Sequence, residues 1–236
     1  MSTFVCALAV GLAMVVIGSI RDAPAQSPAP TPSEGPIHVV TYVEVLPASR
    51  TEGTALLRRY REAARQEDGN LRCELLSRVG QPHQLVILEV WRDQKAFATH
   101  GASATAASTR EKIHAIRGAP IDERVHLAVA SGPLQPGPAG DAVYVVTHVD
   151  VIPPRKDDGL AAVKQLADAS RPSPGNVRFE VVQQISRPNH FTVVEIWRDA
   201  QAAEAHAMAE ATRRFRDALG PMSGALYDER MLRAVD

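Results

Sequence analysis

Two histidines and two tryptophans stand at matching places along the chain, and their types point to chemistry. His100 and His206 carry imidazoles, which titrate near neutral pH and can exchange a proton during a reaction. Trp91 and Trp197 each precede one of these histidines by nine residues, and an indole can stack on an aromatic molecule. We therefore predict these four as catalytic residues. The residue types leave two alternatives open: a His that ties down a loop, and a Trp that packs against a sheet.

A second recurring set carries charge. It consists of Arg72, Glu74 and Glu89, which recur as Arg178, Glu180 and Glu195. Opposite charges at strand positions that alternate with apolar residues favour an ion network between two sheets. The recurring Asp-Glu-Arg at 122–124 and 228–230 is predicted to cap the last strand and set its register.

Charge and motif content argue against several classes of function. The chain has 26 Lys and Arg against 27 Asp and Glu, and this balance gives no basic field for nucleic acid. Its eight histidines are scattered, with no HExxH motif and no close cluster with Asp or Cys, so no metal site is predicted. Glycine-rich dinucleotide or phosphate fingerprints and a Gly-x-Ser-x-Gly elbow are also missing. We therefore predict chemistry without a cofactor.

The candidate residues recur because the chain is an internal duplication. Residues 37–130 align with 143–236 without a gap, and 29 of 94 positions are identical, about 31%. Every matched pair, such as Trp91 and Trp197, is 106 residues apart. Residues 131–142 contain three Pro and three Gly, and are predicted to link domain 1 (37–130) to domain 2 (143–236).

Each copy has the periodicity of the ferredoxin-like order, β-α-β-β-α-β. In the first copy, alternating apolar and β-branched residues predict strands at 39–46, 71–79, 85–91 and 121–129. Helical spacing predicts one helix over 50–66 and a second that follows Asp93, its N-cap, to about residue 117. These elements must position the candidate residues in both copies.

The two faces of this sheet differ in the partner that they need. One face is apolar and suits a cover of helices, and Cys73 on it is predicted to be a core hydrophobe. The other face would carry Arg72, Glu89 and Trp91, a mixture that suits a second sheet. We therefore predict an α+β fold in which two tandem ferredoxin-like domains pack sheet to sheet as an intramolecular pseudo-dimeric α+β barrel.

The N-terminal segment is predicted to be an export signal. Residues 1–20 have no charged side chain, and Ala23 and Ala25 are small residues at the positions that a signal peptidase reads. Cleavage after Ala25 would leave a proline-rich tether, 26–36, and place the protein in the periplasm or outside the cell. An uncleaved membrane anchor is the alternative, because about 17 apolar residues approach the shortest length that spans a bilayer.

The repeated motif resembles that of a known family. Glu-x-Trp-x-Asp-x-x-Ala-x-x-x-His fits 89–100 and again 195–206, each time after Gly-Asn-x-Arg-x-Glu. The pattern is similar to the antibiotic biosynthesis monooxygenase family of dimeric α+β barrels, and the likeness covers everything except residues 1–36 and the linker. The resemblance implies monooxygenation of a quinol or polyketide-like phenolic without metal or flavin. The substrate itself then activates oxygen, and the protein supplies a pocket with acid/base groups.

The resemblance also bears on individual residues. Members that act on polyketides use Tyr, Trp and Arg in the pocket, so Tyr42, His148, Arg110 and Arg216 are predicted to bind substrate. Tyr42 and His148 are equivalent positions of different type, which allows only one copy to be active.

Other members of the family leave different functions open. Haem-degrading relatives have an Asn, a Trp and a His where this chain has Thr41, His100 and Arg110, so haem degradation is not expected. Non-catalytic members also exist. A binding or stress-related protein that holds a small hydrophobic molecule in the barrel therefore stays open beside the enzyme, as do a purely structural module and a further homodimer.

Overall fold

The computed structural model describes residues 35–134, 137–138 and 140–235. The predicted signal 1–25, most of the tether 26–36 and three residues of the linker lie outside the described residues, so export stays a prediction. Within the described ranges, no helix is long and apolar enough to cross a membrane.

Both halves follow the predicted order, except that two helices replace the second one. The first half contains β1 (Ile37–Glu44), α1 (Arg50–Ala64), β2 (Asn70–Arg78), β3 (Gln81–Trp91), α2 (Gln94–Gly101), α3 (Ala104–Ile116) and β4 (Asp122–Ala130). The second half contains β5 (Val143–Asp150), α4 (Lys156–Ser170), β6 (Asn176–Gln184), β7 (His190–Trp197), α5 (Ala200–Ala207), α6 (Glu210–Leu219) and β8 (Asp228–Ala234). The extra helix α3 begins where Ser103 caps a new N-terminus, because its side chain accepts a hydrogen bond from the Ala106 amide at 3.1 Å.

The eight strands close into one antiparallel barrel in the order β1-β3-β2-β8-β5-β7-β6-β4. Each half supplies four neighbouring strands, and its last strand also pairs with the other half, β8 with β2 and β4 with β6. The edges that an isolated half would expose are thereby paired. The predicted fold is confirmed: two tandem ferredoxin-like units form an intramolecular α+β barrel.

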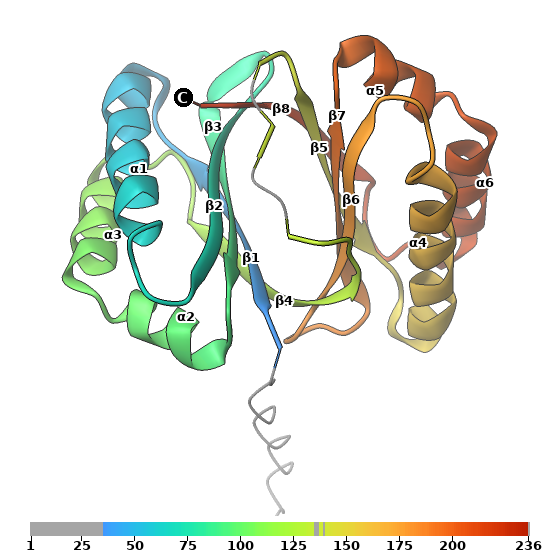
Figure 1. Ribbon diagram of the computed structural model, residues 1–236, viewed down its shortest axis with the longest axis horizontal. Coiled ribbons are helices and arrows are strands. Elements are labelled where there is room, and N and C mark those ends of the chain that lie inside the picture. The colour runs from blue at the N-terminus through green and yellow to red at the C-terminus, as the bar shows by residue number, and fades with distance from the viewer. Residues whose placement is uncertain (1–34, 135–136, 139, 236) are drawn as a thin grey trace, which may run out of the picture. The chain divides into compact units, whose positions relative to one another are not determined.

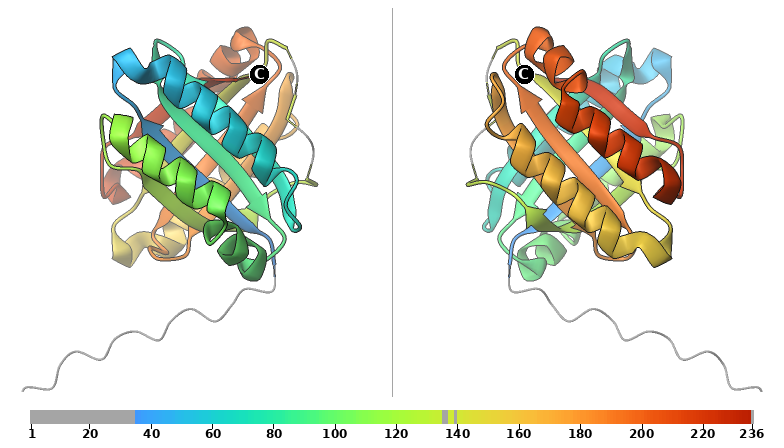
Figure 2. Two further views of the ribbon diagram at one scale, coloured as in Figure 1. Left: turned by 90° about the vertical axis from the view of Figure 1, so that its left-hand side faces the viewer. Right: turned by 90° about the vertical axis from the view of Figure 1, so that its right-hand side faces the viewer.

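The helices lie outside the barrel in two groups. Figure 1 shows α1 and α3 on one side and α4 and α6 on the other, and Figure 2 shows each pair lying across its own strands. One apolar core fills the space between helices and strands in each half. A third core lies inside the barrel and includes Tyr42, Leu88, Tyr144 and Val194. The candidate site residues are divided among these three spaces.

The structure corrects the predicted faces of β3. Glu89 lies opposite Val39 on β1 and Cys73 on β2, so it shares their face, which the helices cover. Trp91 belongs to the same helix-side core, whereas Leu88 points into the barrel. The sequence misleads here because residues 85–88 are apolar on both faces, so alternation does not identify the inner one.

Candidate active site

The repeated motif first builds a turn that places the histidine. Asp93 Oδ1 accepts a hydrogen bond from the Ala96 amide at 2.7 Å and caps α2, and Asp199 caps α5 in the same way. Gly69 has φ +87°, and a Cβ there would lie 2.5 Å from the Cβ of Ala96. Only glycine fits such a position without strain. The Gly-Asn and Ala-x-x-x-His parts of the motif therefore stabilise this turn in the fold. They fix the histidine at the end of the short helix.

In the first copy, His100 is held by hydrogen bonds on both ring nitrogens. Its Nε2 lies 2.7 Å from the hydroxyl of Tyr60 on α1, and its Nδ1 lies 2.9 Å from Glu67 Oε2. The Tyr60 hydroxyl also contacts both carboxylate oxygens of Glu89 at 3.2 Å. Trp91 stacks on the His100 ring with the centroids 4.4 Å apart. His100 is thus a buried link between α2, α1 and β3.

In the second copy, the same motif makes a more open arrangement. Leu166 on α4 replaces Tyr60, so no hydroxyl reaches the histidine from that helix. His206 Nε2 lies 3.3 Å from Glu195 Oε2 and 3.3 Å from Thr212 Oγ1. Trp197 stacks on His206 at 4.5 Å and donates its indole N–H to Glu195 Oε2 at 2.8 Å. The carboxylate and the imidazole therefore face each other directly.

A pocket of about 70 Å³ opens beside this pair. Glu195 and His206 form its buried floor, and Arg216, Tyr227 and Glu229 line its exposed rim. Glu229 Oε2 accepts hydrogen bonds from the Tyr227 hydroxyl at 3.0 Å and from Arg216 Nη2 at 3.2 Å. The pocket thus leads from a rim that carries a guanidinium, a phenol and carboxylates to an acid/base pair.

Burial shifts the pKa values of Glu195 and His206 in opposite directions, and these shifts determine which of the two exchanges a proton near neutral pH. It raises the pKa of the Glu195 carboxyl to about 7 and lowers the pKa of His206 to about 4. His206 is therefore a neutral hydrogen-bonding group at pH 7, and Glu195 is the group poised to take or give a proton. In the first copy, burial raises the pKa of Glu89 further, to about 8.

The corresponding pocket in the first copy has about 50 Å³ and a different lining. Its lining includes apolar side chains together with Thr41, Tyr60, Thr109, Arg110 and Glu123, but not His100. This pocket therefore does not join the histidine of the first copy to its arginine. In the second copy, the predicted histidine and arginine line the same pocket, as His206 and Arg216.

Comparison with known proteins shows where this chain stands. The sequence profile described as "Antibiotic biosynthesis monooxygenase" matches residues 36–112 and again residues 142–218. The chain belongs to the antibiotic biosynthesis monooxygenase family. It is 30% identical over 81 residues to the "Putative monooxygenase YcnE" of Bacillus subtilis (strain 168), an alignment that covers 34% of this chain and 85% of that protein.

Two solved structures of similar architecture extend over most of the chain. A "putative monooxygenase" of Fusobacterium nucleatum subsp. nucleatum ATCC 25586 superposes with a TM-score of 0.75 at 16% identity and covers 86% of this chain and 93% of its own. An "anthrone oxidase-like protein" superposes with a TM-score of 0.70 at 16% identity and covers 86% and 92%. At these identities the likeness establishes the fold of both tandem family domains.

The remaining predicted substrate residues lie elsewhere in this family member. Tyr42 is buried inside the barrel, where the guanidinium groups of Arg124 and Arg230 lie 4.9 and 4.4 Å from its ring centroid. His148 occupies the matching position of the second copy. Both residues are on the barrel side of the sheet, opposite to His100 and His206, so the structure separates them from the helix-side pockets.

Trp91 and Trp197 also differ from the predicted role. Both indoles are completely buried, and neither lines the pocket of its own copy. Each indole stacks on the histidine of its own copy and so fixes the plane of the imidazole ring.

The predicted ion network is confirmed inside the barrel for four of its six members. Arg72 pairs with Glu180 at 2.7 and 2.9 Å, and Arg178 pairs reciprocally with Glu74. Glu89 and Glu195 are the exceptions, because they lie on the helix side. The Asp-Glu-Arg repeat also contributes pairs within one strand, between Arg124 and Asp122 and between Arg230 and Asp228.

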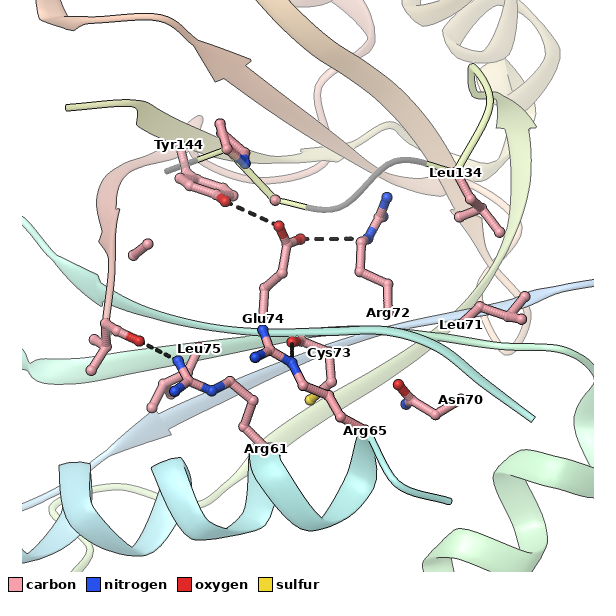
Figure 3. A pocket seen from close by; sticks show the side chains of 14 residues that line it. Arg61, Arg65, Asn70, Leu71, Arg72, Cys73, Glu74, Leu75, Leu134 and Tyr144 are labelled. Carbon is pink, nitrogen blue, oxygen red and sulfur yellow. Dashed lines mark hydrogen bonds and ion pairs between the residues drawn. The ribbon is translucent and has the colours of Figure 1, made fainter. Parts of the chain in front are cut away.

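The largest cavity, about 670 Å³, lies beside this network, as Figure 3 shows. Most of its polar side chains are already engaged, Asn70 being an exception. Tyr144 donates to Glu74 at 3.0 Å, and Arg65 donates to the Cys73 carbonyl at 2.9 Å. Arg61 likewise donates to the carbonyl of Val235. The cavity has the size of a ligand site, but no acid/base group in it is free of an ion pair or hydrogen bond among the described residues.

Several functional candidates were not evident from the sequence. Tyr227 replaces Ile121 of the first copy, and Leu166 replaces Tyr60. A comparison of the positions at which the two copies differ could have identified these residues. His148, Asp150 and His190 also come together at one end of the barrel, although 42 residues separate the two histidines. No local motif marks such a cluster, because β5 and β7 become neighbours only in the folded sheet.

Proposed function

We propose that the second copy carries the active site of a cofactor-independent monooxygenase that acts on a quinol or a related phenolic. The pocket between Arg216, Tyr227, Glu195 and His206 is the observation that carries the proposal. It combines a rim that suits an aromatic, partly anionic molecule with a buried base. Family membership supports monooxygenation, and the choice of substrate class rests on this lining.

The reaction needs only substrate and oxygen. A quinol or anthrone-type substrate, written RH₂, reacts with O₂ to give RO and water, so one oxygen atom enters the product and the other leaves as water. Glu195 accepts the first proton as the substrate ionises, and neutral His206, 3.3 Å away, holds the carboxylate in place. The electron-rich anion then reduces O₂, and the electrons come from the substrate itself.

Arg216 and Tyr227 bind and orient the ionised substrate in this scheme. The guanidinium stabilises the negative charge that develops when the proton leaves, and the phenol ring offers a stacking surface. The pocket of about 70 Å³ is smaller than the roughly 300–1,000 Å³ of most ligand sites, so the aromatic ring must enter by displacing rim side chains. Tyr227, 41% exposed, is the side chain best placed to move.

A non-catalytic binding function is the second candidate, and the cavity of about 670 Å³ favours it by size. Its arginine-rich lining suits a polar or anionic molecule better than a hydrophobic one. Binding that leaves the ligand unchanged would mark this function.

The test uses a panel of reduced quinols and anthrones under ¹⁸O₂, with purified protein treated with chelator beforehand. Wild-type protein should incorporate one labelled oxygen per product faster than a protein-free blank, and the Arg216→Ala variant should lose most of the excess rate. Ligand retained at stoichiometric amounts without labelled product would replace the enzyme proposal by the binding function.

A further inference from the structure

Three potential metal ligands meet at the barrel side of β5 and β7, which run side by side (Figure 1). His148 Nε2 lies 3.1 Å from His190 Nδ1, and His190 Nε2 lies 3.4 Å from Asp150 Oδ1. One ligand atom from each residue lies within 4.8 Å of those of the other two. This cluster plays no part in the proposed oxygenation, which is on the other side of the sheet.

We propose that His148, His190 and Asp150 bind one first-row divalent transition metal ion, with Zn²⁺ as the representative case. Two imidazoles and a carboxylate are a donor set that such ions favour over Mg²⁺ or Ca²⁺, which prefer oxygen alone.

The spacing of the two imidazole nitrogens fits this assignment. Ligands at about 2.0–2.1 Å from a tetrahedral or octahedral ion are roughly 2.9–3.4 Å apart, and the observed separation is 3.1 Å. One carboxylate oxygen of Asp150 lies within 4.8 Å of a ligand nitrogen of each histidine, close enough to serve as the third ligand. The Asp150 side chain is 20% exposed, so the ion has a path from solvent and water can complete the coordination.

The first copy provides an internal contrast. The equivalent residues are Tyr42, Glu44 and Gln84, and Gln84 donates a hydrogen bond to Glu44 at 3.0 Å. A phenol and an amide are poor ligands for these metals. Of these two equivalent positions in the fold, only the one in the second copy therefore has a suitable set of ligands. The proposal therefore predicts one ion per chain.

The charges around the cluster permit a cation. Arg124 lies near both histidines, but its guanidinium makes three hydrogen bonds with Asp122, at 2.6, 3.0 and 3.1 Å.

The experiment titrates the full chain, carrying no histidine tag, with Zn²⁺ by calorimetry and with Co²⁺ by visible absorption. His148→Tyr and His190→Gln place the residues of the first copy in the second, and His114→Gln removes an exposed histidine on α3 as a matched control. Wild type and H114Q should bind one ion, with the Co²⁺ spectrum of a site containing nitrogen ligands. H148Y and H190Q should lose this binding, and Asp150→Asn should weaken it by about ten- to a hundredfold.

Circular dichroism and melting without metal show whether each variant is folded, and a Zn²⁺-induced rise in Tm should occur only in wild type and H114Q. D150N keeps both imidazoles and so tests the site if a histidine variant fails to fold. The proposal is overturned if wild type binds no ion at a saturable site, or if folded variants of the cluster bind as wild type does.

Discussion

The two copies use one motif in two ways. In the first, His100 is tied to Tyr60 and Glu67, and the link is sealed within the helix-side core. In the second, Leu166 leaves His206 facing Glu195 beside an open pocket. Retention of a motif in both copies therefore shows a shared scaffold, and the residues around the motif decide whether its acid/base groups can reach a substrate.

Inside the barrel, by contrast, the two copies make equivalent contacts. There the copies are reciprocal, because Arg72 reaches Glu180 and Arg178 reaches Glu74 across the barrel. Neither half can satisfy its own buried charges completely. The duplication thus keeps symmetry where the halves hold each other together and loses it at the helix-side pockets.

The largest difference between the copies should come from alanine substitution of each histidine. His206→Ala should lower turnover roughly 10- to 100-fold, because it removes the hydrogen-bonding group that holds the base Glu195 in place, with modest change in stability. His100→Ala should retain turnover but cost about 1–3 kcal/mol of unfolding free energy, because it leaves buried partners unsatisfied. Oxygen uptake and urea unfolding measure the two effects, and equal loss of turnover in both variants would break the contrast.

The reciprocal ion pairs should respond equally. Arg72→Met and Arg178→Met each remove the cross-barrel partner of a buried glutamate, which keeps only a longer contact of 3.4–3.5 Å with the arginine of its own strand. Each variant should lose up to about 3–5 kcal/mol of unfolding free energy. Urea unfolding of both variants beside wild type gives the comparison. A large cost for one and a small cost for the other would show that the halves do not share the network.

The pH dependence of stability should separate the two buried glutamates. Burial raises the pKa of Glu89 to about 8 and that of Glu195 to about 7, both above the usual value of 4.5. A raised carboxyl pKa stabilises the folded state at low pH, and this stability is lost as pH rises to the folded value. Between pH 7 and 8 Glu89 should therefore account for a fall of about 1 kcal/mol.

The histidines whose folded pKa is lowered add a smaller slope of opposite sign, because the unfolded chain is still partly protonated at pH 7. This slope is common to wild type and both variants, and it comes from His38, His126, His148, His190 and His206. Glu89→Gln should flatten the fall in unfolding free energy from pH 7 to 8, and Glu195→Gln should leave most of it. Urea unfolding at the two pH values decides the point. An unchanged slope in E89Q would contradict the assigned environment of Glu89.

Exchanging the residues that distinguish the copies should also separate their roles. Leu166→Tyr in the second copy should crowd the floor of the pocket, cost about 1–3 kcal/mol of stability and lower turnover. Tyr60→Leu in the first removes the hydroxyl that contacts His100 and Glu89 and should cost about 1–3 kcal/mol with turnover retained. If L166Y turns over substrate at the wild-type rate, the space that Leu166 leaves beside His206 is not needed for activity.

The fold was predictable because several independent features of the sequence indicated the same architecture. The gapless repeat, the strand and helix periods and the charged residues on one face all favoured a closed pair of sheets. The faces of β3 could not be read, since its apolar run allows either register until β1 and β2 pair with it. The break between α2 and α3 was also missed, although Ser103 offered a cap signal.

The site was only partly predictable for a different reason. His206 and Arg216 stand out as repeated residues, but the pocket also depends on Leu166 and Tyr227, which differ between the copies. The cluster of His148 and His190 depends on strand pairing, which brings distant residues together without any local pattern.

If the second copy carries the chemistry, a matched pair of conservative variants should reveal it. Glu195→Gln and Glu89→Gln remove the same group from equivalent positions, and both can be followed by ¹⁸O incorporation into the product of the best substrate in the panel. We expect E195Q to lose the label above the blank and E89Q to keep most of it. Incorporation that survives in E195Q, or that falls equally in both variants, would contradict the claim.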